Sequence, residues 1–281
     1  AGASAIAVGT ANFIDPAVTM KICDGLGRYL YENKIFNIKK EVMLKEQNYK
    51  DFKIFYYDDK YLEIGKKIIE KSFKTVKILK DSKRNYVSEI EIDETNFIMK
   101  EPRNEYIIPQ RKIMTIFKKG EVLSTLININ KLIDEYGFKE YTRPFLAIVR
   151  RKNKMINYSL LLMEKIEGKK EEKNLDMLIE IIKKIHKKGF YHGDFNPSNF
   201  LNSNGKIYIL DTQGKKMIFG NYRAHYDMLT MKMDNYPNMK YPYPKNIFYY
   251  FALFIKKLKK LPMIEKIKTY KKKLREKGWK I

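Results

Sequence analysis

The sequence predicts a bilobal α+β fold, in which a small lobe built on an antiparallel sheet precedes a mainly helical lobe, with an extra βα segment in front. Three observations predict it. Strand-like apolar runs separated by a polar turn occur before residue 100, a helix followed by a short hairpin occurs after residue 174, and the composition changes near residue 35. We therefore divide the chain into an appended segment (1–35), a sheet lobe (52–165) and a helical lobe with a basic tail (166–281).

The appended segment is rich in Ala and Gly, whereas the chain beyond it is rich in Lys, Ile and Tyr. Residues 5–8 predict a buried strand, and Asp15-Pro16 is a favourable helix start, which predicts a helix over 18–30. Residues 1–13 and 25–30 resemble the C-terminal end of a dihydroorotate dehydrogenase, namely its last barrel strand, its flavin-phosphate turn and its final helix. Because one βα unit cannot close a (β/α)₈ barrel, we expect no flavin chemistry here. A fusion remnant, a gene-boundary artefact and an appended cap are the three interpretations.

The sheet lobe is predicted from apolar periodicity. A helix over 61–73 has apolar residues at helical spacing. Three antiparallel strands are predicted over 75–79, 86–92 and 96–99, and a polar turn joins the first two. Further along the chain, a helix is predicted over 122–136, and the apolar run 159–163 predicts a central strand that leads into a hinge.

The helical lobe is predicted to open with a helix, a loop and a hairpin. Residues 175–188 carry apolar side chains at helical spacing, and Gly189 is a typical residue to end that helix. Two short strands, 200–201 and 207–210, flank a turn of Asn, Ser, Asn and Gly. The loop between the helix and the hairpin contains the sequence His-Gly-Asp at 192–194.

Asp194 is followed five positions later by Asn199, and Asp211 stands at the end of the second hairpin strand. The first spacing matches the catalytic loop of kinases, so the order of elements indicates a protein-kinase-like fold. Phosphoryl transfer requires oxygen ligands for a hard cation, which carboxylates and an amide carbonyl supply. We predict that Asp194 accepts or orients the hydroxyl proton, and that Asn199 and Asp211 hold Mg²⁺ on the nucleotide phosphates. His192 is counted with the catalytic residues, and its expected task is to brace the loop.

Four residues are candidates for binding the nucleotide. Lys100 follows the third predicted strand, where kinases place the lysine that contacts the α- and β-phosphates. Glu121 begins the next predicted helix and is the candidate partner of that lysine. The backbone at Glu164 and Ile166 forms the predicted hinge, which would hold adenine between the lobes. Simpler interpretations remain open, because lysines are abundant and an acidic residue also favours a helix N-terminus.

The motifs depart from those of protein kinases. No Gly-x-Gly-x-x-Gly loop is present, Asp-Thr-Gln replaces Asp-Phe-Gly at 211–213, and no Ala-Pro-Glu follows. His-Gly-Asp in place of His-Arg-Asp points away from protein substrates and towards small-molecule kinases. Two alternatives remain: a kinase for another sugar, an aminoglycoside or a protein, and a pseudokinase or basic binding module without turnover. Retention of Asp194, Asn199 and Asp211 together argues against the second.

Composition indicates the kind of partner. The 281 residues carry a net charge of +24, from 57 Lys and Arg against 33 Asp and Glu, which favours anionic partners unless it reflects compositional drift. No nucleic-acid motif is present, so we expect no nucleic acid. Cys23 is the single cysteine, which excludes a disulfide within the chain. No apolar run has the length of a spanning helix and no secretory signal is evident, so we expect a cytoplasmic location.

The C-terminal part combines an aromatic run at 247–255 with a lysine cluster at 256–260 and a basic tail over 266–280. Such a combination suits peripheral contact with an anionic membrane. The alternative is a buried helix of the helical lobe followed by a solvated tail.

From about Phe52 onwards the chain resembles the lipopolysaccharide core heptose kinases of the RfaY/WaaY type. The segments that carry the resemblance are 119–121, 163–168, 186–190, 193–200 and 209–216. The resemblance implies an ATP-dependent kinase that phosphorylates a heptose hydroxyl of the lipopolysaccharide inner core, at the inner face of the inner membrane. It implies Asp194 as catalytic base, Asn199 and Asp211 as metal ligands, and Lys100 as the phosphate-binding lysine. Which heptose and which hydroxyl react is not implied.

Overall fold

The computed structural model describes residues 17–32, 43–262 and 269–270. The chain divides into two compact units, Ala1–Met43 and Leu44–Ile281. In the first unit, helix α2 (Val18–Glu32) lies where a helix over 18–30 is predicted. The predicted strand at 5–8, the helix start at Asp15-Pro16 and most of the basic tail lie outside the described residues.

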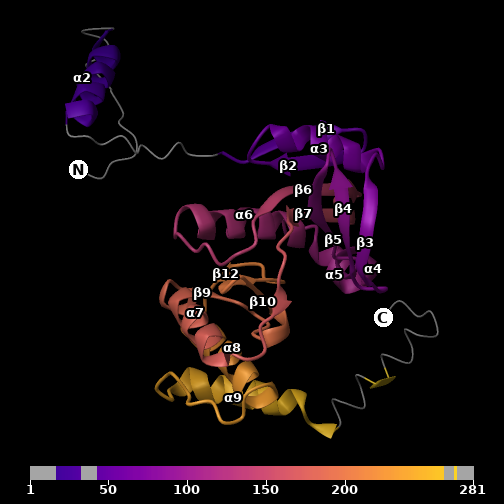
Figure 1. The fold of residues 1–281 in the computed structure, drawn as a ribbon, viewed down its shortest axis with the longest axis vertical. Coiled ribbons are helices and arrows are strands. Elements are labelled where there is room, and N and C mark those ends of the chain that lie inside the picture. Colours follow the sequence, from indigo (N-terminus) through magenta and orange to yellow (C-terminus); the bar gives the residue numbers. More distant parts are fainter. Residues whose placement is uncertain (1–16, 33–42, 263–268, 271–281) are drawn as a thin grey trace. The chain divides into compact units, whose positions relative to one another are not determined.

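The second unit opens with a seven-stranded antiparallel sheet of order β1-β2-β6-β7-β5-β4-β3 (Figure 1). Each neighbouring pair is antiparallel. The strands are β1 (Lys45–Tyr49), β2 (Phe52–Tyr56), β3 (Lys74–Asp81), β4 (Tyr86–Ile92), β5 (Thr95–Glu101), β6 (Pro144–Lys152) and β7 (Met155–Glu164).

Helices cover both faces of this sheet. Alternate residues of β2, β6 and β7 belong to two separate buried clusters, because successive side chains of a strand point to opposite faces. One cluster contains Ile68 of α3 (Lys60–Ile69), and the other contains Val122, Leu123 and Leu126 of α6 (Glu121–Asp134). The short helices α4 (Asn104–Ile107) and α5 (Pro109–Met114) lie between β5 and α6 in the chain. Helix α6 therefore packs on the sheet with its first residue, Glu121, close to β5.

The sheet is larger than predicted. The predicted strands correspond to β3, β4, β5 and β7, whereas β1, β2 and β6 were not predicted. Strand β1 is polar and mostly exposed, so it carries no apolar alternation to reveal it. The predicted helix over 61–73 ends earlier, at Ile69, because Lys71 adopts a left-handed backbone with φ of 59°. The Ser72 N–H then donates to the Lys67 carbonyl at 2.8 Å, as in a Schellman cap.

The helical lobe follows β7. Its helices are α7 (Leu175–Lys187), α8 (Tyr222–Asp234) and α9 (Ile247–Lys259), and its short elements are β8 (Lys169–Lys170), β9 (Phe190–Tyr191), η1 (Pro197–Asn199), β10 (Phe200–Ser203), β11 (Lys206–Ile209) and β12 (Lys215–Lys216). Helix α8 was not predicted. Its residues from Ala224 to Met231 are almost all buried, so the helix lacks the polar face that makes a helical period visible.

Helix α9 is buried on one face only. Ala252 and Lys256 are buried and Lys256 contacts Asp234 of α8, whereas several aromatic side chains of α9 are exposed. In the part of the chain that the structure describes, every helix is too short or too polar to cross a membrane.

Candidate active site

The hairpin of β10 and β11 brings the two predicted metal ligands to one place. Phe200 pairs with Ile209, and the Leu210 N–H donates to the Asn199 carbonyl at 2.8 Å. Asn199 directly precedes β10 and Asp211 closely follows β11, so both lie at the open end of the hairpin. Asn204 and Gly205 form the turn at the other end with positive φ angles of 51° and 83°, as a tight hairpin turn requires.

The catalytic loop is held by a buried carboxylate that sequence reasoning missed. Asp227 of α8 is 1% exposed. It accepts hydrogen bonds from the backbone N–H groups of His192 at 2.7 Å and Gly193 at 3.0 Å, and it lies 3.1 Å from Nε2 of His186. Gly193 has a φ of 92°, a conformation that suits glycine. Asp227 therefore fixes the backbone immediately before Asp194.

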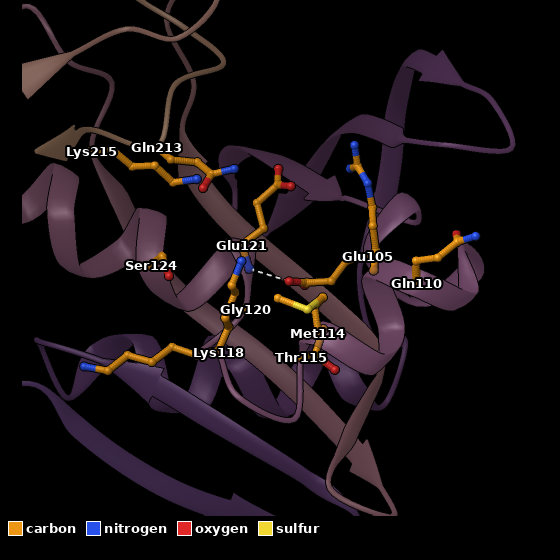
Figure 2. A pocket seen from close by; sticks show the side chains of 12 residues that line it. Glu105, Gln110, Met114, Thr115, Lys118, Gly120, Glu121, Ser124, Gln213 and Lys215 are labelled. Atoms are coloured by element: carbon orange, nitrogen blue, oxygen red, sulfur yellow. Dashed lines mark hydrogen bonds between the residues drawn. The ribbon is translucent and has the colours of Figure 1, made fainter. Parts of the chain in front are cut away.

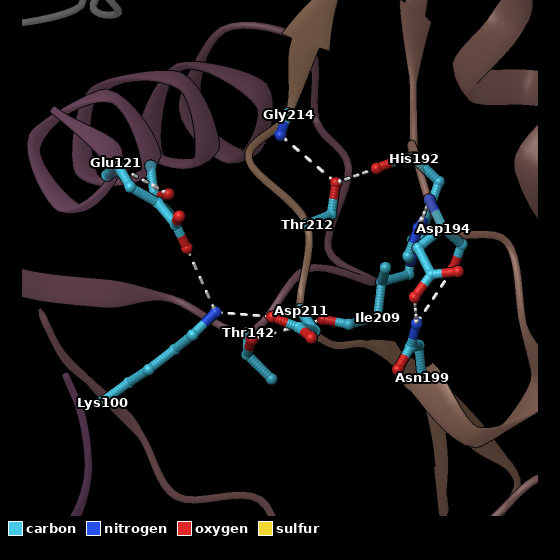
Figure 3. Close-up of polar contacts among 11 residues, drawn as sticks. Lys100, Glu121, Thr142, His192, Asp194, Asn199, Ile209, Asp211, Thr212 and Gly214 are labelled. Atoms are coloured by element: carbon cyan, nitrogen blue, oxygen red, sulfur yellow. Dashed lines mark hydrogen bonds and ion pairs between the residues drawn. The ribbon is translucent and has the colours of Figure 1, made fainter. Parts of the chain in front are cut away.

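Asp194 and Asn199 are joined across the loop (Figure 3). The Asn199 amide donates from Nδ2 to the Asp194 carbonyl at 2.9 Å and to its carboxylate at 3.3 Å. Since the nitrogen of this amide is engaged, its carbonyl oxygen is the atom that is available to a cation. This arrangement couples the predicted base to a predicted metal ligand.

His192 lies behind the loop and is almost completely buried. Its Nδ1 accepts the Asp194 N–H at 3.2 Å, and its ring stacks on Phe200 with centroids 5.4 Å apart. Burial lowers the pKa of His192, so the ring is neutral and serves as an acceptor. Its backbone carbonyl accepts the Thr212 hydroxyl at 2.9 Å, which ties the loop to the residue after Asp211.

Lys100 lies between two carboxylates, as Figure 3 shows. Its Nζ is 2.5 Å from Asp211 and 3.7 Å from Glu121. Burial disfavours the charge on Lys100, but Asp211 and Glu121 outweigh it and raise its pKa. The Lys100 ammonium lowers the pKa of Asp211, against the effect of burial. Both groups are thus charged over the physiological range.

Asp211 has a left-handed backbone with φ of 52°. Among residues other than glycine, Asp and Asn adopt this conformation most readily. The conformation turns the chain directly after β11.

Glu121 is positioned by a second buried carboxylate that the sequence did not reveal. Glu105 of α4 accepts the Glu121 N–H at 2.6 Å and the Ser159 hydroxyl at 3.2 Å. It therefore satisfies a free donor at the start of α6. Burial raises the pKa of Glu105. Gly120 permits the close approach, because a Cβ at this position would lie 2.5 Å from Ile156 and 3.3 Å from Glu105.

The predicted hinge residues lie apart from this charged group. Glu164 ends β7, and Ile166 follows in the segment that links the two lobes. The Glu164 N–H donates to the Arg143 carbonyl at 2.9 Å, and its carboxylate accepts the Arg143 N–H at 3.3 Å. Arg143 in turn pairs with Asp134 at 2.7 Å, so the hinge is anchored to the end of α6.

A cavity of about 300 Å³ opens at the catalytic loop and is lined by Tyr191, His192, Gly193, Asp194, Asp211, Gln213, Lys215 and Arg223. Among the described residues, no group of three or more His, Cys, Asp or Glu side chains could hold a metal ion. The oxygens of Asn199 and Asp211 nevertheless fit Mg²⁺, which keeps several waters and binds substrate phosphates in addition to one or two protein ligands. The predicted base, the two predicted oxygen ligands and the charged Lys100 lie at one site, which is the arrangement that phosphoryl transfer needs.

Comparison with known proteins identifies two sources of similarity. A family model described as lipopolysaccharide core biosynthesis protein (WaaY) matches residues 43–270. The lipopolysaccharide core heptose(II) kinase WaaY of Escherichia coli is 27% identical over 191 residues, which are 62% of this chain and 79% of that protein. The crystal structure of the PknI kinase domain of M. tuberculosis matches with a TM-score of 0.39 and 11% identity, over 62% of this chain and 76% of that one.

The dehydrogenase resemblance is also confirmed. The catalytic subunit of dihydroorotate dehydrogenase B from Bacteroides thetaiotaomicron is 59% identical over 39 residues, and that from Bacteroides fragilis is 70% identical over 30 residues. These stretches are 13% and 10% of the two dehydrogenases. The family model, by contrast, covers nearly all of the second unit, including the sheet, the catalytic loop and the helical lobe. This phosphotransferase chain therefore belongs to the WaaY family of lipopolysaccharide core biosynthesis proteins.

Proposed function

We propose that the enzyme transfers the γ-phosphate of ATP to a heptose hydroxyl of the lipopolysaccharide inner core. The observation that carries the proposal is the grouping of Lys100, Glu121 and Asp211 beside the linked pair of Asp194 and Asn199. Membership of the WaaY family and the similarity to a heptose(II) kinase support the choice of acceptor.

Each side chain has a distinct task in this proposal. Asp194 accepts the proton of the acceptor hydroxyl in the cavity at the catalytic loop. Lys100, held by Glu121, contacts the α- and β-phosphates, and the backbone at Glu164 and Ile166 holds adenine. Asn199 and Asp211 would hold Mg²⁺, which neutralises charge on the phosphates when it is bound. His192 and Asp227 position the loop and do not contact the reacting atoms.

We also propose that the enzyme acts at the cytoplasmic face of the inner membrane, through an apolar surface on the helical lobe. This apolar surface consists of large exposed side chains on α9 and on the segment before α8: Ile218, Phe219, Ile247, Tyr250, Phe251 and Phe254. Phe219 lies 6.2 Å from Phe251 between ring centroids, so the two segments form one surface. The exposed Lys257 lies one helical turn beyond Phe254, which suits an anionic lipid surface.

The function is tested with Asp194→Asn, which removes the base and keeps the shape of the side chain. We expect Mg²⁺-dependent ATP consumption with deep-core lipopolysaccharide as acceptor to fall by about 10²–10⁴-fold. Nucleotide binding is expected to survive, because Lys100 and Asp211 are unchanged. The measurements are initial rates and the affinity for a fluorescent ATP analogue.

Two variants serve as references. Asp211→Ala is expected to lose both turnover and Mg²⁺-dependent nucleotide binding. Asp176→Asn, the same change as Asp194→Asn on an exposed carboxylate of α7, should behave as wild type. An active Asp194→Asn enzyme would rule out the proposed base. Wild-type enzyme that binds ATP but ignores the core acceptor would rule out the proposed acceptor.

A further inference from the structure

A second and larger cavity lies beside the cavity at the catalytic loop. It has a volume of about 740 Å³ and lies between α5, the turn before α6, the first helical turn of α6 and the segment after Asp211. Figure 2 shows Gln213 and Lys215 on one side, Glu105 and Gln110 on the other, and Glu121 and Gly120 between them. Gln213 and Lys215 also line the cavity that contains Asp194. A ligand in the larger cavity would therefore lie next to an acceptor in the smaller one.

The walls of the larger cavity are held in place by the fold. The Arg151 guanidinium donates to the carbonyls of Thr115 at 2.8 Å and Lys118 at 3.0 Å, which fixes the turn before α6. The Thr115 hydroxyl also accepts the Ile156 N–H at 2.9 Å. On the opposite wall, the Asn128 amide donates to the Gln213 carbonyl at 3.0 Å. The cavity is thus a built feature, because both sides are tied to α6 or to the sheet.

The charge of the cavity is positive. Its basic side chains, Arg111, Lys118, Lys119 and Lys215, are exposed, and no carboxylate of the described residues forms an ion pair with any of them. Its two carboxylates are already engaged, since Glu105 accepts the Glu121 N–H and Glu121 pairs with Lys100. Gln110 and Ser124 add groups that can bond to hydroxyls. These features suit an anionic, hydroxyl-rich ligand.

We propose that this cavity binds an anionic substituent, a phosphate or a carboxylate, on the acceptor glycan next to the sugar that is phosphorylated. The inference rests on the proposed function, because it deepens the choice of acceptor. Lys215 stands where the two cavities meet, and Lys118 and Lys119 line the larger one from the turn before α6. Ammonium groups bind such oxygens by charge-assisted hydrogen bonds, which set affinity and position the neighbouring hydroxyl at Asp194.

The test uses the double variant Lys118→Gln/Lys119→Gln and a control, Lys139→Gln/Lys188→Gln, which removes the same charge from exposed positions outside both cavities. The probe is delipidated deep-core oligosaccharide, which is soluble and removes any contribution from the membrane. We expect the cavity variant to raise the KM for this acceptor about tenfold, as the loss of a charged hydrogen bond would. The KM for ATP and the behaviour of the control should match wild type.

Two modified acceptors identify the anionic group. Phosphatase treatment removes phosphates, and carboxyl reduction removes carboxylates. Removal of the group that binds in the cavity should abolish the difference in KM between the variant and wild type. An equal rise in KM for all three acceptors, or no rise, would overturn the inference. Equilibrium binding of the same oligosaccharides separates this outcome from failure of the proposed function. Charge-dependent binding without turnover would leave the cavity assignment standing, whereas turnover without charge dependence would leave only the kinase assignment standing.

Discussion

Asp227 holds the backbone of the catalytic loop in place, although nothing in the sequence around Asp227 indicates this role. Its carboxylate accepts the N–H groups of two consecutive residues, His192 and Gly193, just before Asp194. We expect Asp227→Asn to leave one buried donor without an acceptor and to lower the free energy of unfolding by about 1–3 kcal/mol. Because the loop is then less well positioned, kcat should fall while the KM for ATP changes little.

Urea denaturation and steady-state kinetics measure these two effects separately. Asp176→Asn is again the matched control, since it makes the same change on an exposed side chain of α7. A destabilised Asp227→Asn enzyme with wild-type kcat would show that Asp227 supports the fold only and does not position the base.

Residues that belong to a known motif or occupy a characteristic place in the order of elements, such as Lys100 and Glu121, were accessible from the sequence, whereas the buried carboxylates that support them were not. Asp194, Asn199 and Asp211 lie within 192–211, where spacing alone relates them. Asp227 and Glu105 reach their partners through tertiary packing: Glu105 is 16 positions before Glu121, and Asp227 is 35 positions after His192. A lone acidic residue in a helix predicts an exposed position, so only the structure could reveal that these two are buried.

At the scale of elements, a pH-sensitive group of charges joins α8 and α9. Lys256 is 6% exposed, and its Nζ lies 2.6 Å from the Asp234 carboxylate, with Lys260 at 2.8 Å from the other oxygen. Burial opposes the charge on Asp234, but Lys256 and Lys260 outweigh it and lower its pKa. A lowered folded-state pKa stabilises the fold above the unfolded value, near 3.9, and this stability is lost as pH falls through the folded value.

We therefore expect Lys256→Met to cost about 1 kcal/mol of unfolding free energy near neutral pH, a modest value because Asp234 is partly exposed and keeps Lys260. The difference from wild type should shrink as the pH falls below the unfolded value of Asp234 and through its lowered folded value. Chemical denaturation at neutral and at acidic pH provides the measurement, and Lys257→Met on the exposed side of α9 provides the control. A cost that is the same at both pH values would mean that packing of the Lys256 side chain, and not its charge, holds the helices together.

Most of the predicted elements have periodic burial, although β3 was predicted and is exposed along its whole length. The helices α6 and α7, the strands β4 and β5, and the β10–β11 hairpin have one buried face and turn or cap residues at their ends. Strand β1 is exposed and polar, and α8 is buried over most of its surface, so neither shows a period. Both elements are specified by their neighbours, β1 by pairing with β2 and α8 by packing against α9 and the catalytic loop.

For the whole molecule, the net charge of +24 and the apolar surface on the helical lobe both favour the proposed membrane contact. Attraction of positive charge to anionic lipid is screened by salt, whereas the burial of apolar side chains is not. Binding to vesicles that contain phosphatidylglycerol should therefore weaken with ionic strength but should not vanish. Neutral phosphatidylcholine vesicles should bind much more weakly.

The apolar surface is tested by Ile247→Ser/Phe254→Ser, which removes two large side chains that are 77% and 58% exposed. We expect vesicle affinity to fall at least about tenfold, since burying even part of two such side chains contributes more than 1.4 kcal/mol. The control is Ile78→Ser/Phe117→Ser, at positions of similar exposure on the sheet lobe, 56% and 80%. Co-sedimentation measures binding to vesicles, and light scattering measures association between copies of the enzyme.

Unchanged vesicle binding would exclude the surface as a membrane contact. A variant that turns a dimer into a monomer would assign the surface to contact between copies. Loss of vesicle binding with wild-type turnover on delipidated acceptor would show that the surface delivers the enzyme to its substrate and takes no part in the chemistry.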